Sequence, residues 1–322
     1  RIKSILVDQI DFSMNRLSGM LFSFQSFLDS SRNTVQPPVD FYFEGMNITD
    51  NLGAIALNLI HFTSGPENQV LSSCSQLVEP FRIWIRESNI RNNSFSKGMN
   101  PLWNYGISLF FVNEAQVHMI NSAISLNHFE SYSIFQLDQK AASILFANNS
   151  VSDNIFKNSQ LILTNYLMPE TFCNAMGNIP VRPDKLLYRY SLIVKSNFSR
   201  LAVTSGALFT MNNGFVSFED NNFEAIELNR SSFISSTFTP RTEVSIDLEL
   251  RDSSFGGAES LVRALFDRIE YESEKLAFFN FEKNSVVDIR SDGIKVFSIN
   301  GFGSKQSLVR IEDNNFSWIA LS

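Results

Sequence analysis

One eight-residue pattern recurs along the chain and constrains the fold more than any other feature. It is clearest at 216–223 (VSFEDNNF) and reads apolar, polar, apolar, two polar residues, Asn or Ser, one polar residue, apolar. It returns at 309–316, 279–286 and 248–255, and less strictly at 144–151, 191–198, 117–124, 83–90, 41–48 and 5–12. The spacing between copies ranges from 25 residues (198 to 223) to 47 residues (151 to 198). Ten copies at such spacing predict a solenoid in which each copy marks one coil.

The pattern has a physical interpretation. Its alternating start predicts a short strand with one buried face. Eight of the ten copies carry Asn or Ser in the sixth position, and the exceptions are Ile10 and Met46. Asn tolerates left-handed backbone angles, so we expect the sixth residue to form a sharp corner. The closing residues are then expected to form one inward stack: Phe12, Ile48, Ile90, Ile124, Val151, Phe198, Phe223, Phe255, Val286 and Phe316.

A second apolar stretch recurs between copies, usually after a small residue, as at 53–57, 106–110, 206–210 and 293–297. Two or three short strands per coil with polar corners are typical of a parallel β-helix. The chain resembles the right-handed parallel β-helix of the pectate-lyase-like superfamily over nearly its whole length. The stretch 205–222 also resembles the repeats of polymorphic outer-membrane-protein-type passengers, clearly in one coil only. The resemblance implies an all-β solenoid of about ten coils, but little about function, because this fold hosts lyases, adhesins and structural rods.

Length and composition fit one elongated domain spanning 1–322. A solenoid grows by adding coils, and 44% hydrophobic residues, with 31 Phe among them, supply a continuous core. The net charge of −7 is scattered, which excludes nucleic acid as a natural partner. No apolar run approaches the roughly 18 residues that a membrane-spanning helix needs. Because the chain starts at Arg1 with neither Met nor a signal peptide, we expect a mature product or an excised segment of a larger protein.

Two loop insertions are expected, at 63–80 and 166–188, each containing prolines and one cysteine. Cys74 and Cys173 occupy the same place in their coils, three coil steps apart. That separation is too large for a disulfide on the solenoid itself, but long loops can lean together. We therefore predict a Cys74–Cys173 disulfide that joins the insertions. The periodicity of the stretch 258–275 favours a helix, but its position within the coil favours a strand, and we expect a strand followed by a charged loop.

Six sequons make N-glycosylation candidates of Asn47, Asn92, Asn148, Asn197, Asn229 and Asn315. Chance alone accounts for about that many in so Asn- and Ser-rich a chain. Their placement says more, because Asn47, Asn197 and Asn315 share one position of the pattern, just before the closing residue, where the side chain is expected to face outward.

The search for catalytic chemistry gives weak candidates. The tripeptide 1–3 (RIK) matches one found in polygalacturonases, but the companion elements are absent. The pairs Asp8 and Asp11, Glu219 and Asp220, and Glu312 and Asp313 are corner residues, for which solvated turns are the better interpretation.

Histidines and tryptophans give no stronger signal. His61, His118 and His128 show no metal-ligand spacing, and His118 is expected on the surface beside Trp84 or Leu145. Exposed tryptophans could stack on sugar rings. Trp84 is expected to face outward, Trp318 is expected to face inward, and Trp103 is expected to lie in a loop.

The sequence therefore predicts a non-catalytic, extracellular β-helix with a structural or adhesive role, without cofactor or metal. Both ends of the chain lie on strands, so we expect that neither end is free in the native protein. Either the polypeptide continues beyond this segment, or the last coil of one subunit stacks head to tail on the first coil of the next, as in a surface filament or coat. Carbohydrate or other surface proteins are further candidate partners. The alternative is a carbohydrate-active β-helix enzyme, which needs acidic and basic groups converging on one groove. A passenger module of a larger bacterial surface protein is a third interpretation.

Overall fold

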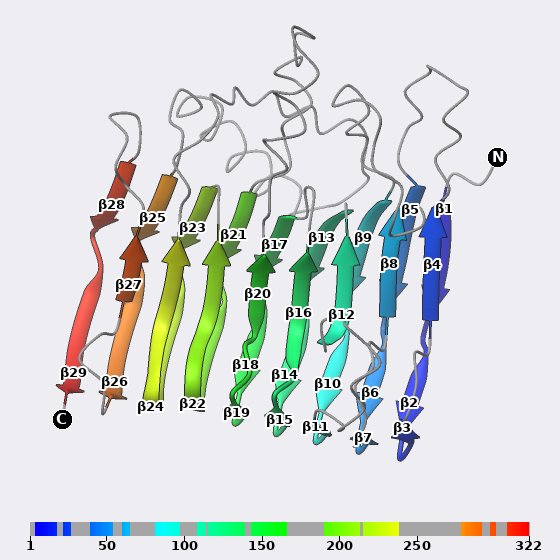
Figure 1. Ribbon diagram of the computed structural model, residues 1–322, viewed down its shortest axis with the longest axis horizontal. Coiled ribbons are helices and arrows are strands. Elements are labelled where there is room, and N and C mark those ends of the chain that lie inside the picture. The colour runs from blue at the N-terminus through cyan, green and yellow to red at the C-terminus, as the bar shows by residue number, and fades with distance from the viewer. Residues whose placement is uncertain are drawn as a thin grey trace, which may run out of the picture.

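The computed structural model describes residues 4–17, 22–26, 39–53, 60–64, 81–96, 108–113, 115–138, 143–165, 190–212, 215–237, 278–291, 297–300 and 308–321. Every element in these ranges is a strand. The strands lie side by side in one long stack, with the N-terminus at one end and the C-terminus at the other (Figure 1). The protein is all-β with stacked parallel strands, consistent with a parallel β-helix. No helix of membrane-spanning length and apolarity occurs in the described part of the chain.

One sheet takes its strands from the first residues of each copy of the pattern. Within the described ranges it has nine strands, and each pairs in parallel with the next of them along the chain. These strands are β1 (Ser4–Asp8), β5 (Val39–Glu44), β9 (Phe81–Arg86), β13 (Ala115–Ile120), β17 (Ser143–Ala147), β21 (Tyr190–Val194), β23 (Phe215–Glu219), β25 (Phe278–Glu282) and β28 (Leu308–Glu312). We call each coil a rung and number the rungs by these strands, from rung 1 (β1) to rung 9 (β28).

The second sheet continues each rung after the first bend. Its first column contains β2 (Asp11–Ser13), β6 (Asn47–Thr49), β10 (Asn89–Arg91), β14 (Ala123–Ser125), β18 (Ser150–Ser152), β22 (Asn197–Asn212), β24 (Asn222–Thr237), β26 (Ser285–Ser291) and β29 (Asn315–Leu321). After a second bend follow β3 (Arg16–Leu17), β7 (Leu52–Gly53), β11 (Ser94–Ser96), β15 (His128–Glu130) and β19 (Ile155–Lys157). The last column holds β4 (Phe22–Ser26), β8 (Ile60–Ser64), β12 (Ser108–Asn113), β16 (Ser133–Asp138), β20 (Ile162–Asn165) and β27 (Phe297–Asn300).

The register of the sheets confirms the predicted stack of closing residues, with one correction. Phe198 pairs with Phe223, and Val286 pairs with Phe316. Phe223, however, pairs directly with Val286, so no rung lies between them. The copy at 248–255, with its closing residue Phe255, lies outside the described residues, and the place in the stack that its position in the sequence predicts holds no rung, since β24 pairs directly with β26.

Each rung bends at intervals of five residues, a spacing that the sequence analysis did not detect. In rung 4 the left-handed residues are Asn121, Leu126 and Ser131, with φ of 52°, 58° and 53°. Rung 5 repeats this at 148, 153 and 158, rung 6 at 195, 200 and 205, and rung 7 at 220, 225 and 230. The left-handed residue of the first bend is thus the fifth residue of the pattern. The prediction that the sixth residue adopts these angles is wrong.

The sixth residues point inward instead and form a ladder of hydrogen bonds along the stack. The amide N–H of Asn221 donates to Asn284 Oδ1 at 3.0 Å, and the N–H of Asn284 donates to Asn314 Oδ1 at 2.8 Å. Asn221 Nδ2 also donates to the carbonyl of Ile193 at 2.9 Å. Asn221 and Asn284 are only 2% and 1% exposed. The Asn221 side chain therefore satisfies an N–H and a carbonyl of the preceding rung, those of Ser196 and Ile193. A serine hydroxyl at this position also accepts from an N–H of the preceding rung, as Ser196 does from Asn149, which explains why Asn and Ser both serve here.

Phenylalanines fill much of the interior. Phe223 stacks on Phe198 with ring centroids 4.7 Å apart, and on Phe281 at 6.0 Å. Phe233 meets Phe223 edge-on at 4.7 Å. All four rings are fully buried in one continuous core. Offset stacks and edge-to-face pairs are the arrangements that aromatic rings prefer.

Several predictions fall on parts of the chain that the structure does not describe. These are the insertion at 166–188, residues 65–80 of the insertion at 63–80, the stretch 258–275, the tripeptide at 1–3, Trp103, and both cysteines of the predicted Cys74–Cys173 disulfide.

Candidate functional site

A polar hollow of about 920 Å³ follows the first bend across rungs 3 to 7. It is lined by the fifth, sixth and seventh pattern residues of these rungs, from Glu87 at one end to Asp220 and Asn222 at the other. Asn148 Nδ2 donates to Asn121 Oδ1 at 2.6 Å, which ties two rungs together along the wall. The first bend creates the hollow, because the fifth and seventh pattern residues turn outward on either side of a buried sixth residue.

The two carboxylates of this hollow are too far apart to act as the acid–base pair of a glycosidase. Its charged lining residues in the described part of the chain are Glu87, Lys195 and Asp220. Glu87 belongs to rung 3 and Asp220 to rung 7, so four strand spacings of about 4.8 Å separate the two carboxylates. A glycosidase needs its two carboxyl groups within about 10 Å of each other. The hollow can hold a polar ligand by hydrogen bonds, but it does not assemble the carboxylate pair of a hydrolase.

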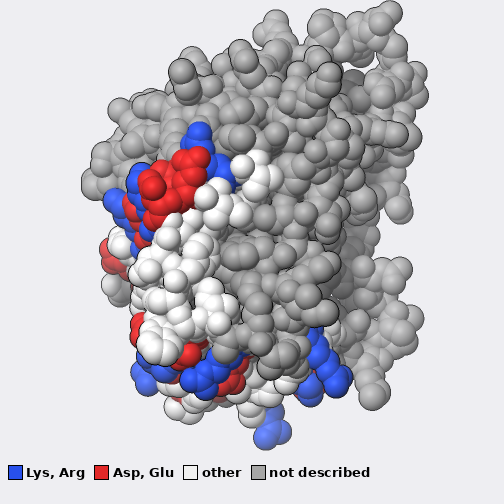
Figure 2. All heavy atoms as spheres, turned by 90° about the vertical axis from the view of Figure 1, so that its left-hand side faces the viewer, with Lys and Arg blue, Asp and Glu red and all other residues white. Residues whose placement is uncertain are grey.

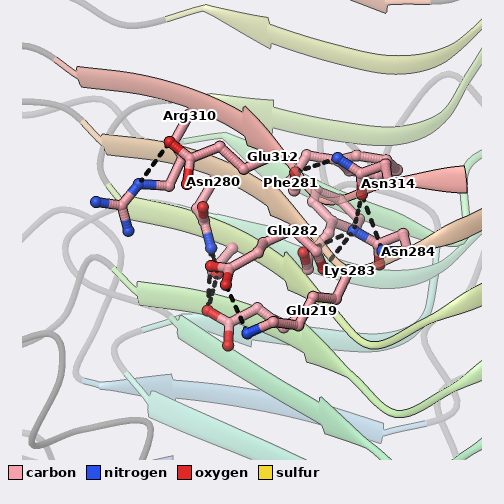
Figure 3. A network of polar contacts seen from close by, with 11 residues as sticks. Glu219, Asn280, Phe281, Glu282, Lys283, Asn284, Arg310, Glu312 and Asn314 are labelled. Carbon is pink, nitrogen blue, oxygen red and sulfur yellow. Dashed lines mark hydrogen bonds and ion pairs between the residues drawn. The ribbon is translucent and has the colours of Figure 1, made fainter.

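A second polar cluster lies on the outer face of the nine-stranded sheet in rungs 7 to 9 (Figure 3). Glu219, Glu282 and Glu312 are aligned in register on β23, β25 and β28. Glu219 Oε1 accepts hydrogen bonds from Ser217 Oγ at 2.7 Å and from Asn280 Nδ2 at 3.1 Å. These bonds hold the first carboxylate of the row in place.

The other two carboxylates of this row have basic partners. Lys283 Nζ lies 2.8 Å from Glu282 Oε1, and Arg310 Nε lies 3.6 Å from Glu312 Oε1. The side chain of Glu282 is only 10% exposed, so a polymer substrate has little access to it. Asn280 is fully buried, and its Oδ1 has no hydrogen-bond partner. Nowhere in the described ranges do three His, Cys, Asp or Glu side chains form a group able to hold a metal ion.

The expected corner pairs do not converge. Glu219 lies on the sheet face, whereas Asp220 is the left-handed bend residue and lines the polar hollow. Glu312 also lies on the sheet face, and Asp313 is the left-handed residue of the bend that follows. Asp8 ends β1 while Asp11 lies beyond the bend on β2, where its Oδ1 accepts a hydrogen bond from Asn47 at 3.3 Å. The cross-rung row of glutamates was missed because its members lie 63 and 30 residues apart; the identical fourth position of their copies was the available signal.

The prediction of a surface histidine at position 118 is wrong. His118 is 2% exposed and lies against Trp84, with ring centroids 3.8 Å apart. Burial lowers the pKa of His118 to about 3, and the positive charges of Arg82 and Arg86 add to this shift. The expected neighbours are confirmed, since His118 pairs with Trp84 and Leu145 in the sheet. His128 is exposed, and the side chain of His61 lies outside the described part.

Neither described tryptophan lies as expected for binding sugars. Trp84 points away from the core but is only 3% exposed, beneath the Arg86 guanidinium at 5.5 Å from its ring. Trp318, expected inward, is 82% exposed. It is the left-handed residue of the second bend, with φ of 57°, and its equivalents Asn92 and Arg200 also point outward. The bend therefore fixes its direction.

All six sequon asparagines lie at outward positions. Asn47, Asn197 and Asn315 are the first residues of β6, β22 and β29, directly after the first bend. Asn92 and Asn148 are left-handed bend residues, and Asn229 lies on β24. Five of the six are exposed, and Asn47 is half-buried. By contrast, none of the eight asparagines found buried among the described residues begins a sequon: Asn51, Asn93, Asn127, Asn149, Asn154, Asn221, Asn280 and Asn284.

Comparisons with known proteins place the chain in no family. No family model matches the sequence, and no curated protein matches it. Among solved structures, tailspike protein 3 of bacteriophage CBA120 aligns with 97% of this chain at 9% identity and a TM-score of 0.14. The chain spans about half of that tailspike, 51% of its length. A superposition of this quality carries no argument about function.

Proposed function

We propose that this protein is a non-catalytic structural rod that associates through its end rungs, outside the cell or on its surface. The observation that carries the proposal is the last rung. Phe281 and Val286 of rung 8 are fully buried, whereas Ile311 and Phe316, which continue the same columns in rung 9, are 47% and 42% exposed. A rung of this kind leaves apolar side chains and a strand edge available to another rung.

The enzyme alternative receives less support from the described residues. The carboxylates of the polar hollow stand at opposite ends of it. The nearer carboxylates, Glu219 and Glu282, are bonded to Ser217, Asn280 and Lys283. A hydrogen-bonded row of this kind stabilises stacked strands and leaves no second carboxylate opposite a substrate bond.

An extracellular location is part of the same proposal. The exposed positions of the sequon asparagines support it, because an oligosaccharide needs an accessible side chain. Expression through a eukaryotic secretory pathway, followed by peptide mapping before and after enzymatic deglycosylation, tests this part. We expect glycans on Asn197 and Asn315. A secreted, folded product with all six sites unmodified contradicts it.

End association is tested with the 1–322 chain by light scattering over a wide range of protein concentration. The average mass is expected to rise above that of the monomer, and Ile311→Asp is expected to prevent this. Ile155→Asp is the matched control, because Ile155 is also 47% exposed but lies in rung 5, away from both ends. A monomer at every concentration, or equal effects of the two substitutions, overturns the proposal.

A further inference from the structure

Three glutamates stand side by side on the outer face of rungs 7 to 9. Glu219, Glu282 and Glu312 lie in register on neighbouring strands, which are about 4.8 Å apart, and like charges placed in this way repel. Among the described residues, Lys283 and Arg310 form ion pairs with the row. Figure 2 looks onto this end of the stack, where Asp and Glu side chains gather in one group with Lys and Arg side chains at its border. A further positive charge would therefore be favourable beside the row.

Asn280, in the middle rung of this row, has an unsatisfied oxygen. Its side chain is fully buried, and its Nδ2 donates to Ser217 Oγ at 3.0 Å and to Glu219 Oε1 at 3.1 Å, both in rung 7. The oxygen and the nitrogen of an amide group point in different directions, so Asn280 Oδ1 faces rung 9, on the side of Glu312 (Figure 3). This oxygen has no hydrogen-bond partner among the described residues. Native proteins satisfy nearly all such groups with protein, water or an ion.

The position of this oxygen does not depend on the strand edge of rung 9. It lies between β25 and β28, which are both described and in which Asn280 pairs with Arg310. Arg310 carries donors, but its Nε lies with Glu312, 3.6 Å from Oε1. The buried oxygen and the carboxylates of the row therefore lie together between two paired strands.

The oxygens at this position suit a calcium ion. Asn280 Oδ1 and the carboxylates of Glu282 and Glu312 are hard oxygen ligands without a nitrogen or sulfur ligand among them. Ca²⁺ takes about six to eight oxygens from carboxylates, Asn carbonyls and water in a flexible geometry, whereas Mg²⁺ requires a strict octahedron. No three acidic or histidine side chains form a metal-binding group in the described ranges, so the amide oxygen is needed to complete the set.

We propose that rungs 8 and 9 bind a calcium ion between Asn280 Oδ1 and the carboxylates of Glu282 and Glu312. The ion takes the place of Lys283 beside Glu282, and the lysine side chain, which is 55% exposed, moves into solvent. Water fills the remaining coordination positions, so we expect a dissociation constant of about 10⁻⁴ to 10⁻³ M, as in extracellular calcium modules. The bound ion joins β25 to β28 and does not require end association.

Isothermal titration calorimetry of the 1–322 chain with calcium chloride, after dialysis against a chelator, tests this site. Magnesium chloride is expected to bind more weakly. Glu282→Gln and Glu312→Gln each remove one carboxylate ligand, and each should raise the calcium dissociation constant at least about tenfold. Asn280→Ser places the residue of rung 7 in the same column of rung 8. It should weaken calcium binding similarly, because the shorter side chain does not reach the ion.

Glu219→Gln is the matched control. It removes the same charge from the same row, but Glu219 lies on the Nδ2 side of Asn280 and is not a ligand of the proposed ion. We expect its calcium dissociation constant to change by less than about threefold. Circular dichroism melting in chelator confirms that each variant is folded. Calcium at about 10 mM should raise the melting temperature of the original chain and of Glu219→Gln, but not that of Glu312→Gln.

The possible outcomes are distinct. Selective loss of calcium binding in Glu282→Gln, Glu312→Gln and Asn280→Ser supports the site. Absence of calcium binding up to about 10 mM overturns it. Equal weakening in these variants and in Glu219→Gln assigns the effect to the charge or the stability of the row and also overturns it. Binding that all four variants retain places the ion elsewhere and overturns it as well. None of these readouts depends on the mass of the protein in solution, so failure of this site and failure of end association are distinguishable.

Discussion

The second bend is built differently in the two halves of the stack. In rungs 1 to 5 the residue three positions after the closing residue is an asparagine: Asn15, Asn51, Asn93, Asn127 and Asn154. In rungs 6 to 9 the same position holds Leu201, Ile226, Ile289 and Ile319. Both sets continue one column, because β22 pairs in register with β18 before the bend and with β19 after it.

The two halves satisfy the same bend by different means. In the first half, Asn127 Oδ1 accepts from the N–H of Asn93 at 2.9 Å, and Asn127 Nδ2 donates to the carbonyl of Ile90 at 2.9 Å. In the second half the strands β22, β24 and β26 run through the bend without interruption, and the aliphatic side chain joins the core. The left-handed residue before it is kept in both halves, as Leu126 and Ala225 show. The backbone bend is thus independent of the side chain that lies beneath it.

The largest effect is expected when the asparagine of the first half is placed in the second. Ile226→Asn removes a fully buried side chain, which contributes about 2–3 kcal/mol. It also buries an amide between Leu201 and Ile289, at about 1–3 kcal/mol. We expect a loss of about 4–5 kcal/mol in urea unfolding, against about 1 kcal/mol for the control Ile226→Val. A loss equal to that of the control would mean that the bend accepts either side chain.

The reciprocal substitution should cost less, because it keeps the volume of the side chain. Asn127→Leu leaves the N–H of Asn93 and the carbonyl of Ile90 without their side-chain partner. Orphaned buried groups of this kind predict a loss of about 3 kcal/mol. Asn92→Leu, at the exposed left-handed position where rung 4 has Leu126, is the control and should cost less than about 1 kcal/mol. Equal losses of stability in Asn127→Leu and Asn92→Leu would mean that the cost comes from changing the bend and not from the lost hydrogen bonds.

Acid should weaken the first half before the second. Below pH 6.5 the unfolded chain binds a proton at His118, while the folded chain does not until about pH 3. Stability is therefore lost as the pH falls through this window, by about 2 kcal/mol between pH 6.5 and 5. The same column holds Ser217 and Asn280 in the second half, which do not titrate.

Hydrogen exchange at several pH values measures this loss, and we expect protection to fall first around β13. His118→Leu, which continues the column with the residue found at 145, should remove this pH dependence. An unchanged slope in this variant would assign the acid sensitivity to other groups.

The architecture was readable from the sequence because the pattern repeats what a parallel stack requires at each rung. Strand, bend and inward closing residue all follow from alternation and spacing, and Phe198 and Phe223 lie as predicted. The copy at 248–255 led to the wrong prediction of a rung between those of Phe223 and Val286. The pattern identifies a sequence that is able to form a rung, but it does not show that this rung takes its place in the stack. The direct pairing of β24 with β26 is a tertiary contact, which the sequence of a single copy does not show.

The candidate site was less predictable. The alternation correctly predicts that the side chains of His118 and Trp84 point away from the core. It does not indicate whether other side chains bury that face of the sheet. The glutamate row of rungs 7 to 9 emerges only when the copies are aligned position by position. Trp318 was misplaced because the second bend, five residues after the first, breaks the alternation on which its direction was predicted.

The smallest expected effect tests why Asn or Ser occupies the sixth position of the pattern: to form the ladder of hydrogen bonds, or to turn the chain at a corner. Asn221→Ser keeps an oxygen that can accept from the N–H of Ser196 and donate to a carbonyl, as Ser196 Oγ does to Val194 at 3.0 Å. We expect a loss of about 1 kcal/mol for the hydrogen bonds that the shorter side chain does not reach. Asn221→Gly removes the hydrogen bonds of the ladder at this rung but permits any backbone angle. We expect it to lower the free energy of unfolding in urea by about 3 kcal/mol. If the position were selected for turning the chain, glycine would be tolerated at least as well as serine, because it adopts left-handed angles without strain. The order of the two losses therefore decides between the ladder and the corner.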